Sequence, residues 1–326
     1  MQNIVVFGGS GFIGSQLVSR LSSAGCRVLV PTRRRERAKH LLPLPTVDVV
    51  QIDTFDNATL RRLVDGRDAV VNLVGILHGR RGTPYGADFA RAHVRLPQNL
   101  AAACADCGVR RMLHMSALGA DSQGPSMYLR SKGDGEAAVR DAEAGLQWTI
   151  MRPSVVFGEQ DHLLNLFASL QRRLPLLLLG GAQQRFAPVY VGDLAQAMTQ
   201  ALIGRHARAS IGRIYELGGP RTYALRELVQ LAARLAGVRQ RPVLGLPHAA
   251  AGLLAGLMEL APGQPLMSRD NLESMRVPSV PGGGMPGFAA ELGVAQPASI
   301  EAVAPEWLRH LGPQSEFDRL RAQAGR

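Results

Sequence analysis

Hydrophobic residues gather in short continuous runs through the first half of the chain. These runs cover residues 4–7, 28–30, 49–52, 69–74, 111–115 and 148–151. Continuous apolar runs of this length are typical of strands buried on both faces of a parallel sheet. Segments with helical periodicity lie between them, at residues 12–24, 35–42, 58–64, 88–104 and 127–143. The alternation predicts an α/β fold of the Rossmann type, a doubly wound parallel sheet with right-handed crossovers.

The regular alternation loosens after Pro153. Shorter apolar runs at residues 176–179 and 214–217 alternate there with further helical segments. This less regular half has the character of a lobe that covers a ligand. We therefore expect a Rossmann domain over residues 1–157 and a smaller C-terminal α/β lobe over residues 158–326, interleaved with the first.

A glycine-rich loop follows the first predicted strand directly. Gly8, Gly11 and Gly14 are spaced three residues apart, and the first helical segment begins inside the loop. Glycines suit this place because the backbone must turn tightly, approach a pyrophosphate closely and let the helix pack against the strand. In this context the motif predicts a bound dinucleotide, NAD(P)(H). The loop residues expected to contact it are Gly8, Ser10, Gly11, Phe12, Ile13 and Gly14.

The end of the second predicted strand bears on the choice of cofactor. An acidic residue at this place binds the ribose 2′-OH of NAD, whereas arginine accommodates the 2′-phosphate of NADP. Here Arg33 and Arg34 follow the strand, and no carboxylate stands at its end. We therefore expect a preference for NADP(H), with NAD(H) as the alternative. The start of a solvated basic helix would explain the same arginines without a ligand.

Two later strand ends supply further candidate contacts with the cofactor. Asp53 follows the third predicted strand, where it would reach the adenine amino group, although a helix or turn cap explains it almost as well. Val74 and Gly75 end the fourth strand. A small residue at that place would let the cofactor backbone pass.

Tyr128 and Lys132 form a second candidate constellation. They lie four residues apart in a predicted helix, so their side chains share one face of it. A nearby ammonium favours the phenolate and lowers the pKa of tyrosine from about 10. The pair thus predicts an acid or base at Tyr128, and the same ammonium could bond the nicotinamide ribose.

Composition strengthens the case for Lys132. Among 37 basic residues only Lys39 and Lys132 are lysines, so the formal net charge of +11 comes almost entirely from arginine. Arginine is always charged and forked, whereas lysine is a compact point charge. A lysine at this position indicates a requirement that arginine would not meet. The plainer alternative is an ordinary pair on the helix surface.

Charge and cysteine content limit the classes of partner. The arginines are scattered and not interleaved with aromatic residues, which argues against nucleic acid. Three cysteines and no signal peptide indicate the reducing cytoplasm. The C-x-x-C spacing of Cys104 and Cys107 in an Ala-rich segment favours helix packing, and no metal site is expected. The longest apolar segment, residues 246–261, is expected to form a buried helix, with a membrane surface or a partner as the alternatives.

Three further stretches complete a family resemblance, and they are residues 115–117, 152–158 and 188–193. Together with the glycine motif and the Tyr128/Lys132 pair, they resemble the short-chain dehydrogenase/reductase superfamily in its extended and atypical branches, which are epimerase/dehydratase-like. The resemblance covers most of the chain. It implies further cofactor contacts at Pro153, Val155 and Val156.

Within that superfamily, four stretches are most similar to the accessory subunits of respiratory complex I that share this fold, and to their bacterial relatives. The stretches are residues 128–132, 161–168, 188–191 and 215–220. Similar proteins also act in ubiquinone biosynthesis. The resemblance implies tightly held NADP(H), a small-molecule substrate of the quinone kind, and an association with a respiratory complex or the periphery of the inner membrane.

The third catalytic group of the family falls on either Ser116 or Ala117. Enzymes of the family place a serine or threonine there to polarise the substrate oxygen. If the position is Ser116, the set with Tyr128 and Lys132 is complete; if it is Ala117, the protein would hold its cofactor and turn over poorly. Two alternatives to a quinone-linked oxidoreductase stay open, a nucleotide-sugar epimerase, dehydratase or reductase and a non-catalytic scaffold that a nucleotide stabilises.

Overall fold

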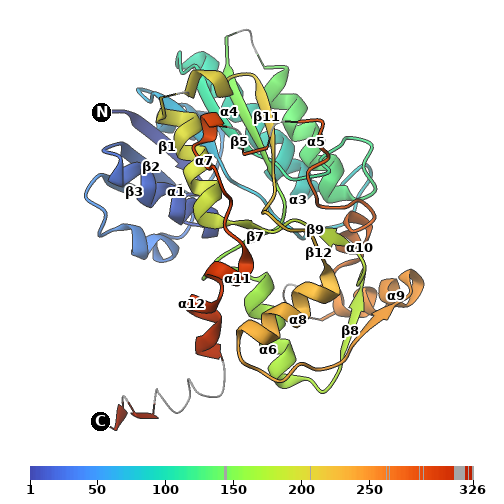
Figure 1. Cartoon of the computed structure of the whole chain (residues 1–326). Helices are drawn as coiled ribbons and strands as arrows, with labels where there is room; N and C mark the ends of the chain where they lie inside the picture. The colour runs from blue at the N-terminus through green and yellow to red at the C-terminus, as the bar shows by residue number, and fades with distance from the viewer. Residues whose placement is uncertain are drawn as a thin grey trace. The chain divides into compact units, whose positions relative to one another are not determined.

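A computed structural model describes residues 1–142, 145–205, 207–261, 263, 265–285, 287–288, 290–311, 320–321 and 323–324 (Figure 1). The chain divides into two compact units. The first unit comprises Met1–Pro153, Val191–Leu217 and Pro281–Ala295, and the second comprises Ser154–Tyr190, Gly218–Val280 and Gln296–Arg326. The expected boundary lay after residue 157. The observed break comes at Pro153, and two later segments, both expected in the C-terminal lobe, belong to the first unit.

A seven-stranded sheet forms the centre of the first unit, in the order β11-β6-β5-β4-β1-β2-β3. All of its strand pairs are parallel. The strands are β1 (Asn3–Phe7), β2 (Arg27–Thr32), β3 (Val47–Gln51), β4 (Ala69–Asn72), β5 (Arg111–Met115), β6 (Gln147–Pro153) and β11 (Arg213–Leu217). The order reverses between β1 and β4, which makes the crevice beyond their carboxyl ends the expected ligand position. The sheet confirms the predicted doubly wound parallel fold.

Two rows of helices accompany this sheet. One row contains α2 (Asn57–Val64), α4 (Leu96–Asp106) and α5 (Met127–Arg140), and the other pairs α1 (Phe12–Ser23) with α7 (Val191–Ile203). The continuous apolar run of β1 is completely buried, and its Val5 and Phe7 share a core with α2 and α4. Burial on both faces explains why the strand has no polar alternation.

Two predicted helices of the first unit differ from regular α-helices. The segment expected at residues 35–42 is the 3-10 helix η1 (Arg35–Leu41). The segment expected at residues 88–104 is interrupted, because the π-helix η2 (Ala90–Arg95) lies between α3 (Ala87–Phe89) and α4. The short 3-10 helices η3 (Ala207–Ser210) and η4 (Ala290–Leu292) complete the unit.

The second unit combines three small two-stranded sheets with a helical core. The sheets pair β7 (Val156–Phe157) with β10 (Val189–Tyr190), β8 (Leu177–Gly180) with β13 (Val243–Leu246), and β9 (Arg185–Phe186) with β12 (Tyr223–Ala224). The helices are α6 (Leu163–Arg173), α8 (Leu225–Leu235), α9 (His248–Met258), α10 (Arg269–Ser274), α11 (Ile300–Val303), α12 (Pro305–Leu308) and the 3-10 helix η5 (Arg309–Leu311). Side chains of α6, α8 and α12 form the core of this unit.

Helix α9 corrects the expectation for the apolar segment at residues 246–261. Ala251 and Ala255 are buried, but Leu253 and Leu257 are 70% and 58% exposed, so the helix buries one face only. Among the described residues, no helix is both long enough and apolar enough to span a bilayer. Cys104, by contrast, lies in the core of the first unit, as helix packing requires.

Candidate functional site

The loop between β1 and α1 has a backbone shape that only glycines allow. Gly8 has φ +83°, a conformation that side chains with a Cβ rarely adopt. A Cβ on Gly14 would lie 2.2 Å from the Gly8 carbonyl oxygen, and one on Gly8 would lie 3.0 Å from the Leu73 carbonyl carbon. The predicted reasons for glycine here, a tight turn and close helix–strand packing, are therefore present in the backbone.

The start of α1 suits an anion. Gly11 is the N-cap residue and offers no side chain to the first backbone N–H groups of the helix, and no acidic residue stands in the first turn. Free N–H groups and the helix dipole favour a phosphate at such an end. Ser10, Phe12 and Ile13 are half-buried beside it. The loop therefore fits the pyrophosphate of a dinucleotide.

The carboxyl ends of β2 and β3 carry the residues expected to read the adenosine half. Arg33 and Arg34 follow β2 directly and are exposed. The Thr32 hydroxyl donates to the Arg34 carbonyl oxygen at 3.2 Å, which holds this turn. Asp53 is exposed just beyond β3. Because β2 pairs with β1 on one side and β3 on the other, all three lie at the same sheet edge as the glycine loop.

The loop after β4 approaches the glycine loop closely. A Cβ on Gly8 would lie 3.2 Å from the Val74 backbone nitrogen. Val74 N–H donates to Asn72 Oδ1 at 3.2 Å, so the buried amide at the end of β4 fixes the turn through Val74 and Gly75. The sequence predicted that these two residues end the strand, but β4 ends at Asn72, so they lie in the loop just beyond it.

Helix α5 presents Tyr128 and Lys132 from the same side. The Ser126 hydroxyl caps the helix by accepting from Leu129 N–H at 3.1 Å. Lys132 is 3% exposed, and its Nζ donates to the Met115 carbonyl oxygen at the end of β5 at 2.6 Å. The Tyr128 ring is half-buried and packs edge-on against His93, with ring centroids 5.6 Å apart.

The pKa values of this pair correct the expectation from the sequence. Burial raises the pKa of Tyr128 to about 12, rather than lowering it. Burial also lowers the pKa of Lys132 to about 8, although the charge of Glu136 opposes the shift. The reason is desolvation, which disfavours the charged form of each group. At neutral pH the protein therefore holds a phenol, not a phenolate, at Tyr128.

Ser116 is the better candidate for the third catalytic group. Its side chain is 3% exposed, and no described residue offers its Oγ a hydrogen-bond partner. Its backbone N–H donates to the Met151 carbonyl oxygen at 2.7 Å, which holds it at the end of β5. A buried hydroxyl without a partner is costly, and a ligand oxygen would satisfy it. Ala117 has only a methyl group to offer.

An ion-pair network that the sequence did not suggest supports α5. Glu136 is 1% exposed and accepts two hydrogen bonds from Arg152, at 2.8 and 2.6 Å. The Arg152 Nη1 atom is also 3.7 Å from Glu216 Oε1 on β11. The only sequence signal was the position of Glu136, four residues after Lys132. The network ties α5 to β6 and β11.

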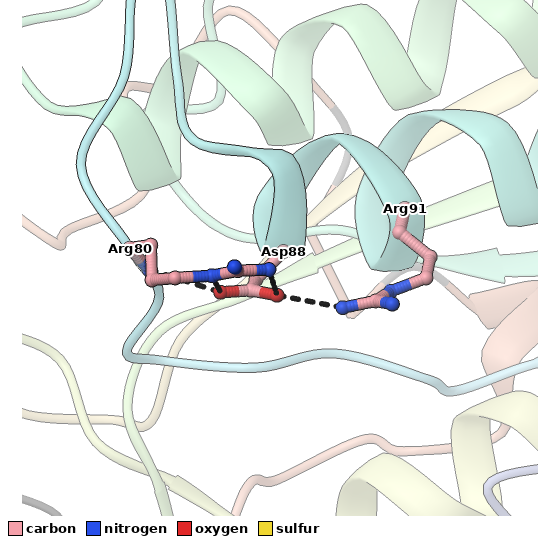
Figure 2. A network of polar contacts seen from close by, with 3 residues as sticks. All are labelled: Arg80, Asp88 and Arg91. Atoms are coloured by element: carbon pink, nitrogen blue, oxygen red, sulfur yellow. Dashed lines mark hydrogen bonds and ion pairs between the residues drawn. The ribbon is translucent and has the colours of Figure 1, made fainter.

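The segment between β4 and α3 is anchored beside α5 at several points. The Arg80 guanidinium makes a two-point contact with Asp88, which also bonds Arg91 (Figure 2). These arginines hold the pKa of Asp88 well below its usual range. Tyr85 donates to Asp134 Oδ2 on α5 at 2.6 Å. The segment is therefore bonded both to α3, through Asp88, and to α5, through Asp134.

The remaining expected cofactor contacts divide between the units. Pro153 ends β6 in the first unit, and its carbonyl oxygen accepts from Leu118 N–H at 3.1 Å. Val155 and Val156 belong to the second unit, where the Val155 carbonyl oxygen accepts from Val189 N–H at 3.0 Å. Each therefore has a defined place in its own unit.

Comparison with known proteins decides the family. Residues 4–218 match the model of the NAD dependent epimerase/dehydratase family. The chain belongs to this family. The resemblance inferred from the motifs is thereby confirmed.

Two proteins similar in sequence to this epimerase/dehydratase chain are named as subunits of respiratory enzymes. The mitochondrial NADH-ubiquinone oxidoreductase 40 kDa subunit of Neurospora crassa is 31% identical over 271 residues, 82% of this chain and 69% of that protein. The mitochondrial NADH dehydrogenase (ubiquinone) 1 alpha subcomplex subunit 9 of Rattus norvegicus is 31% identical over 312 residues, 93% of this chain and 79% of that protein. The similarity thus extends over most of the epimerase/dehydratase chain.

A solved dTDP-glucose 4,6-dehydratase from Streptomyces venezuelae, with NAD and TYD bound, shares the fold. Its TM-score is 0.71 at 23% identity, over 94% of this chain and 96% of that chain. As for metals, no group of three or more candidate ligands occurs among the residues that the structure describes.

Proposed function

We propose that this epimerase/dehydratase family member binds NADP(H), in preference to NAD(H), and serves quinone metabolism or a respiratory NADH–ubiquinone oxidoreductase. The observation that carries the proposal is the glycine loop. Gly14 could not bear a Cβ without contact with the Gly8 carbonyl oxygen at 2.2 Å, and α1 begins without a side-chain cap. A loop of this shape at the carboxyl edge of a parallel sheet binds a pyrophosphate.

The chain's residues divide the work of holding the cofactor. The N–H groups at the start of α1 would bind the pyrophosphate, and Asp53 would bond the adenine amino group. Arg33 and Arg34 would bind the 2′-phosphate, since both are exposed and charged beyond β2. The contacts proposed along the rest of the cofactor within the first unit are Val74, Gly75, Lys132 and Pro153.

The buried polar residues favour reduction of a carbonyl-like group. NADP(H), when bound, supplies or accepts the hydride. Because burial raises the pKa of Tyr128 to about 12, its phenol keeps its proton at neutral pH and could donate it to a substrate oxygen. The Ser116 hydroxyl, buried without a partner among the described residues, would donate a hydrogen bond to the same oxygen. Lys132 would hold the ribose.

The respiratory setting is proposed from the relatives. Proteins named as subunits of NADH-ubiquinone oxidoreductase cover 82% and 93% of this chain at 31% identity. A chain similar over most of its length would take a similar place, at a respiratory complex on the periphery of the inner membrane, and a quinone-like molecule would be its substrate. The sequence expectation of a cytoplasmic protein agrees with a position on the cytoplasmic side of that membrane.

Binding measurements test the cofactor. We expect the purified protein to bind NADPH in calorimetry, or to carry it already, as its absorbance would show. An Arg33→Ala/Arg34→Ala variant should lose at least roughly tenfold in affinity for NADPH and little for NADH, since even one charge-assisted bond is worth about 1.5–3 kcal/mol. If the protein binds neither NADPH nor NADH, the proposal of a nicotinamide cofactor is refuted. Equal losses for both would refute the role of the arginines.

The family name favours one other activity, that of an enzyme acting on a nucleotide sugar. The dehydratase of similar fold was solved with TYD as well as NAD. Thermal shift measurements with dTDP- and UDP-sugars would separate the two activities. Stabilisation by a nucleotide sugar, with turnover lost in Tyr128→Phe, would favour this second function; stabilisation by a short-chain ubiquinone favours the first.

A further inference from the structure

His93 is a buried histidine to which the proposed function assigns no role. It lies in the π-helix η2 and is 1% exposed. Its own backbone touches α5 closely, because a Cβ on Gly135 would lie 2.0 Å from the His93 carbonyl oxygen. π-helical turns are rare and occur often at functional sites.

The hydrogen bonds of His93 fix its tautomer. Ile76 N–H donates to Nε2 at 3.0 Å, so Nε2 carries no proton. The ring proton is then on Nδ1, which donates to the Ser131 hydroxyl at 2.8 Å. The Ser131 hydroxyl in turn donates a hydrogen bond to the Tyr128 carbonyl oxygen at 2.8 Å. One neutral ring thus joins the loop after β4 to the turn of α5 that begins at Tyr128.

Burial and ring packing both favour the neutral form of His93. Burial, assisted by the charge of Lys132, lowers the pKa of His93 to about 2. The ring also packs edge-on against Tyr128, at an interplanar angle of 83°, and against Phe89 at 5.5 Å. The Nδ1–H tautomer therefore persists over the whole physiological pH range.

We infer that His93 is a positioning residue, which holds the loop at Val74–Ile76 and the Tyr128/Lys132 turn of α5 at one fixed separation. The inference rests on the proposed function, in which the loop contacts the cofactor and the helix contacts both cofactor and substrate. That proposal assigns His93 no contact with the cofactor or the substrate. Its two nitrogens act on the two elements simultaneously, so a change at His93 should affect both.

Three variants test this role. His93→Phe keeps an aromatic ring against Tyr128 but removes both hydrogen bonds, which leaves Ile76 N–H and Ser131 Oγ without the ring. His93→Gln restores an acceptor for Ile76 N–H. Gln171→Leu is the matched control in the second unit, because the buried Gln171 side chain likewise bonds one backbone segment twice, at Arg241 N and O.

The measurements are calorimetry with NADPH and hydrogen exchange of the cofactor-free protein. For His93→Phe we expect the Kd for NADPH to rise about tenfold, because the loop at residues 74–76 and the helix turn at Tyr128 lose the ring that joins them. Exchange should become faster in two peptides together, residues 74–80 and residues 128–135. His93→Gln should recover most of the affinity. Gln171→Leu should lower the melting temperature and leave the Kd and both peptides unchanged.

The outcomes separate this inference from the proposed function. If the wild-type protein binds no nicotinamide cofactor, the proposed function fails, and the exchange data still test the coupling by His93. If the wild type binds NADPH and His93→Phe binds it equally well, the inference is wrong. Faster exchange in only one of the two peptides would also overturn it, because the residue would then support a single element.

Discussion

Backbone atoms make the contacts at the glycine loop, whereas buried side chains make them at α5. At the loop, Gly8 and Gly14 matter because a Cβ would collide with neighbouring backbone. At α5, Lys132 and Glu136 are 3% and 1% exposed and depend on their partners Met115 and Arg152. The two halves of the proposed site should therefore fail in different ways, the loop by steric overlap and the helix by loss of charge compensation.

The largest effect is expected at the helix. Arg152→Met leaves the carboxylate of Glu136 buried without its main partner, and breaking such a pair costs about 3–5 kcal/mol. Urea denaturation should show this loss of unfolding free energy. The double variant Arg152→Met/Glu136→Met should recover most of it. A double variant as unstable as the single one would mean that packing, not charge, holds this region.

The loop should show the next largest effect. Gly14→Ala places a methyl group 2.2 Å from the Gly8 carbonyl oxygen, so the loop must shift. We expect a loss of about 2–3 kcal/mol in unfolding free energy, typical of overpacking, and a higher Kd for NADPH. Gly252→Ala is the control, because a Cβ there meets no atom within 4 Å. That variant should be equal to wild type or more stable by up to about 1 kcal/mol.

The titration of Lys132 gives a pH signature for the helix. Its pKa is lowered from 10.5 to about 8, so between these values the unfolded chain binds more protons than the folded one. Stability should then rise with pH from 8 to 10, by about 2 kcal/mol from this group, and fall again on lowering the pH. Lys132→Met should lack this rise. Parallel stability curves for the two proteins would contradict the burial of a titrating lysine.

The smallest effect is expected on the surface beside the helix. Arg80 is 75% exposed, and solvent screens its contact with Asp88 (Figure 2). Arg80→Ala should melt at a temperature not resolved from wild type. A clear loss of stability would show that the segment between β4 and α3 depends on this ion pair rather than on Tyr85 and His93.

Cellular complementation addresses whether the site still does chemistry. A Tyr128→Phe/Lys132→Ala variant should lose the cellular function if the protein is an oxidoreductase, because the proton donor is gone. Retained function, with the cofactor still bound, would identify the non-catalytic scaffold instead. Because Lys132 is buried, near-wild-type melting of the double variant itself serves as the fold control.

The sequence was sufficient where one short segment determines the structure. The apolar run before Gly8 predicted a buried parallel strand, and β1 forms there. The spacing of Tyr128 and Lys132 predicted a shared helix face, and both lie on α5. The sequence failed at residues 88–104, because nothing in their periodicity indicates the π-helix that interrupts this helix.

By itself, the sequence determined the sheet, the glycine loop and the candidate residues, because strand burial and glycine geometry are local properties. Only the tertiary structure decided what surrounds those residues. It raised the pKa of Tyr128, which the sequence predicted to be lowered, and paired Arg152 with Glu136 and Glu216. It also brought Ile76 and Ser131 to the two nitrogens of His93. Desolvation and hydrogen bonding between segments distant in sequence set these properties, and no local pattern encodes them.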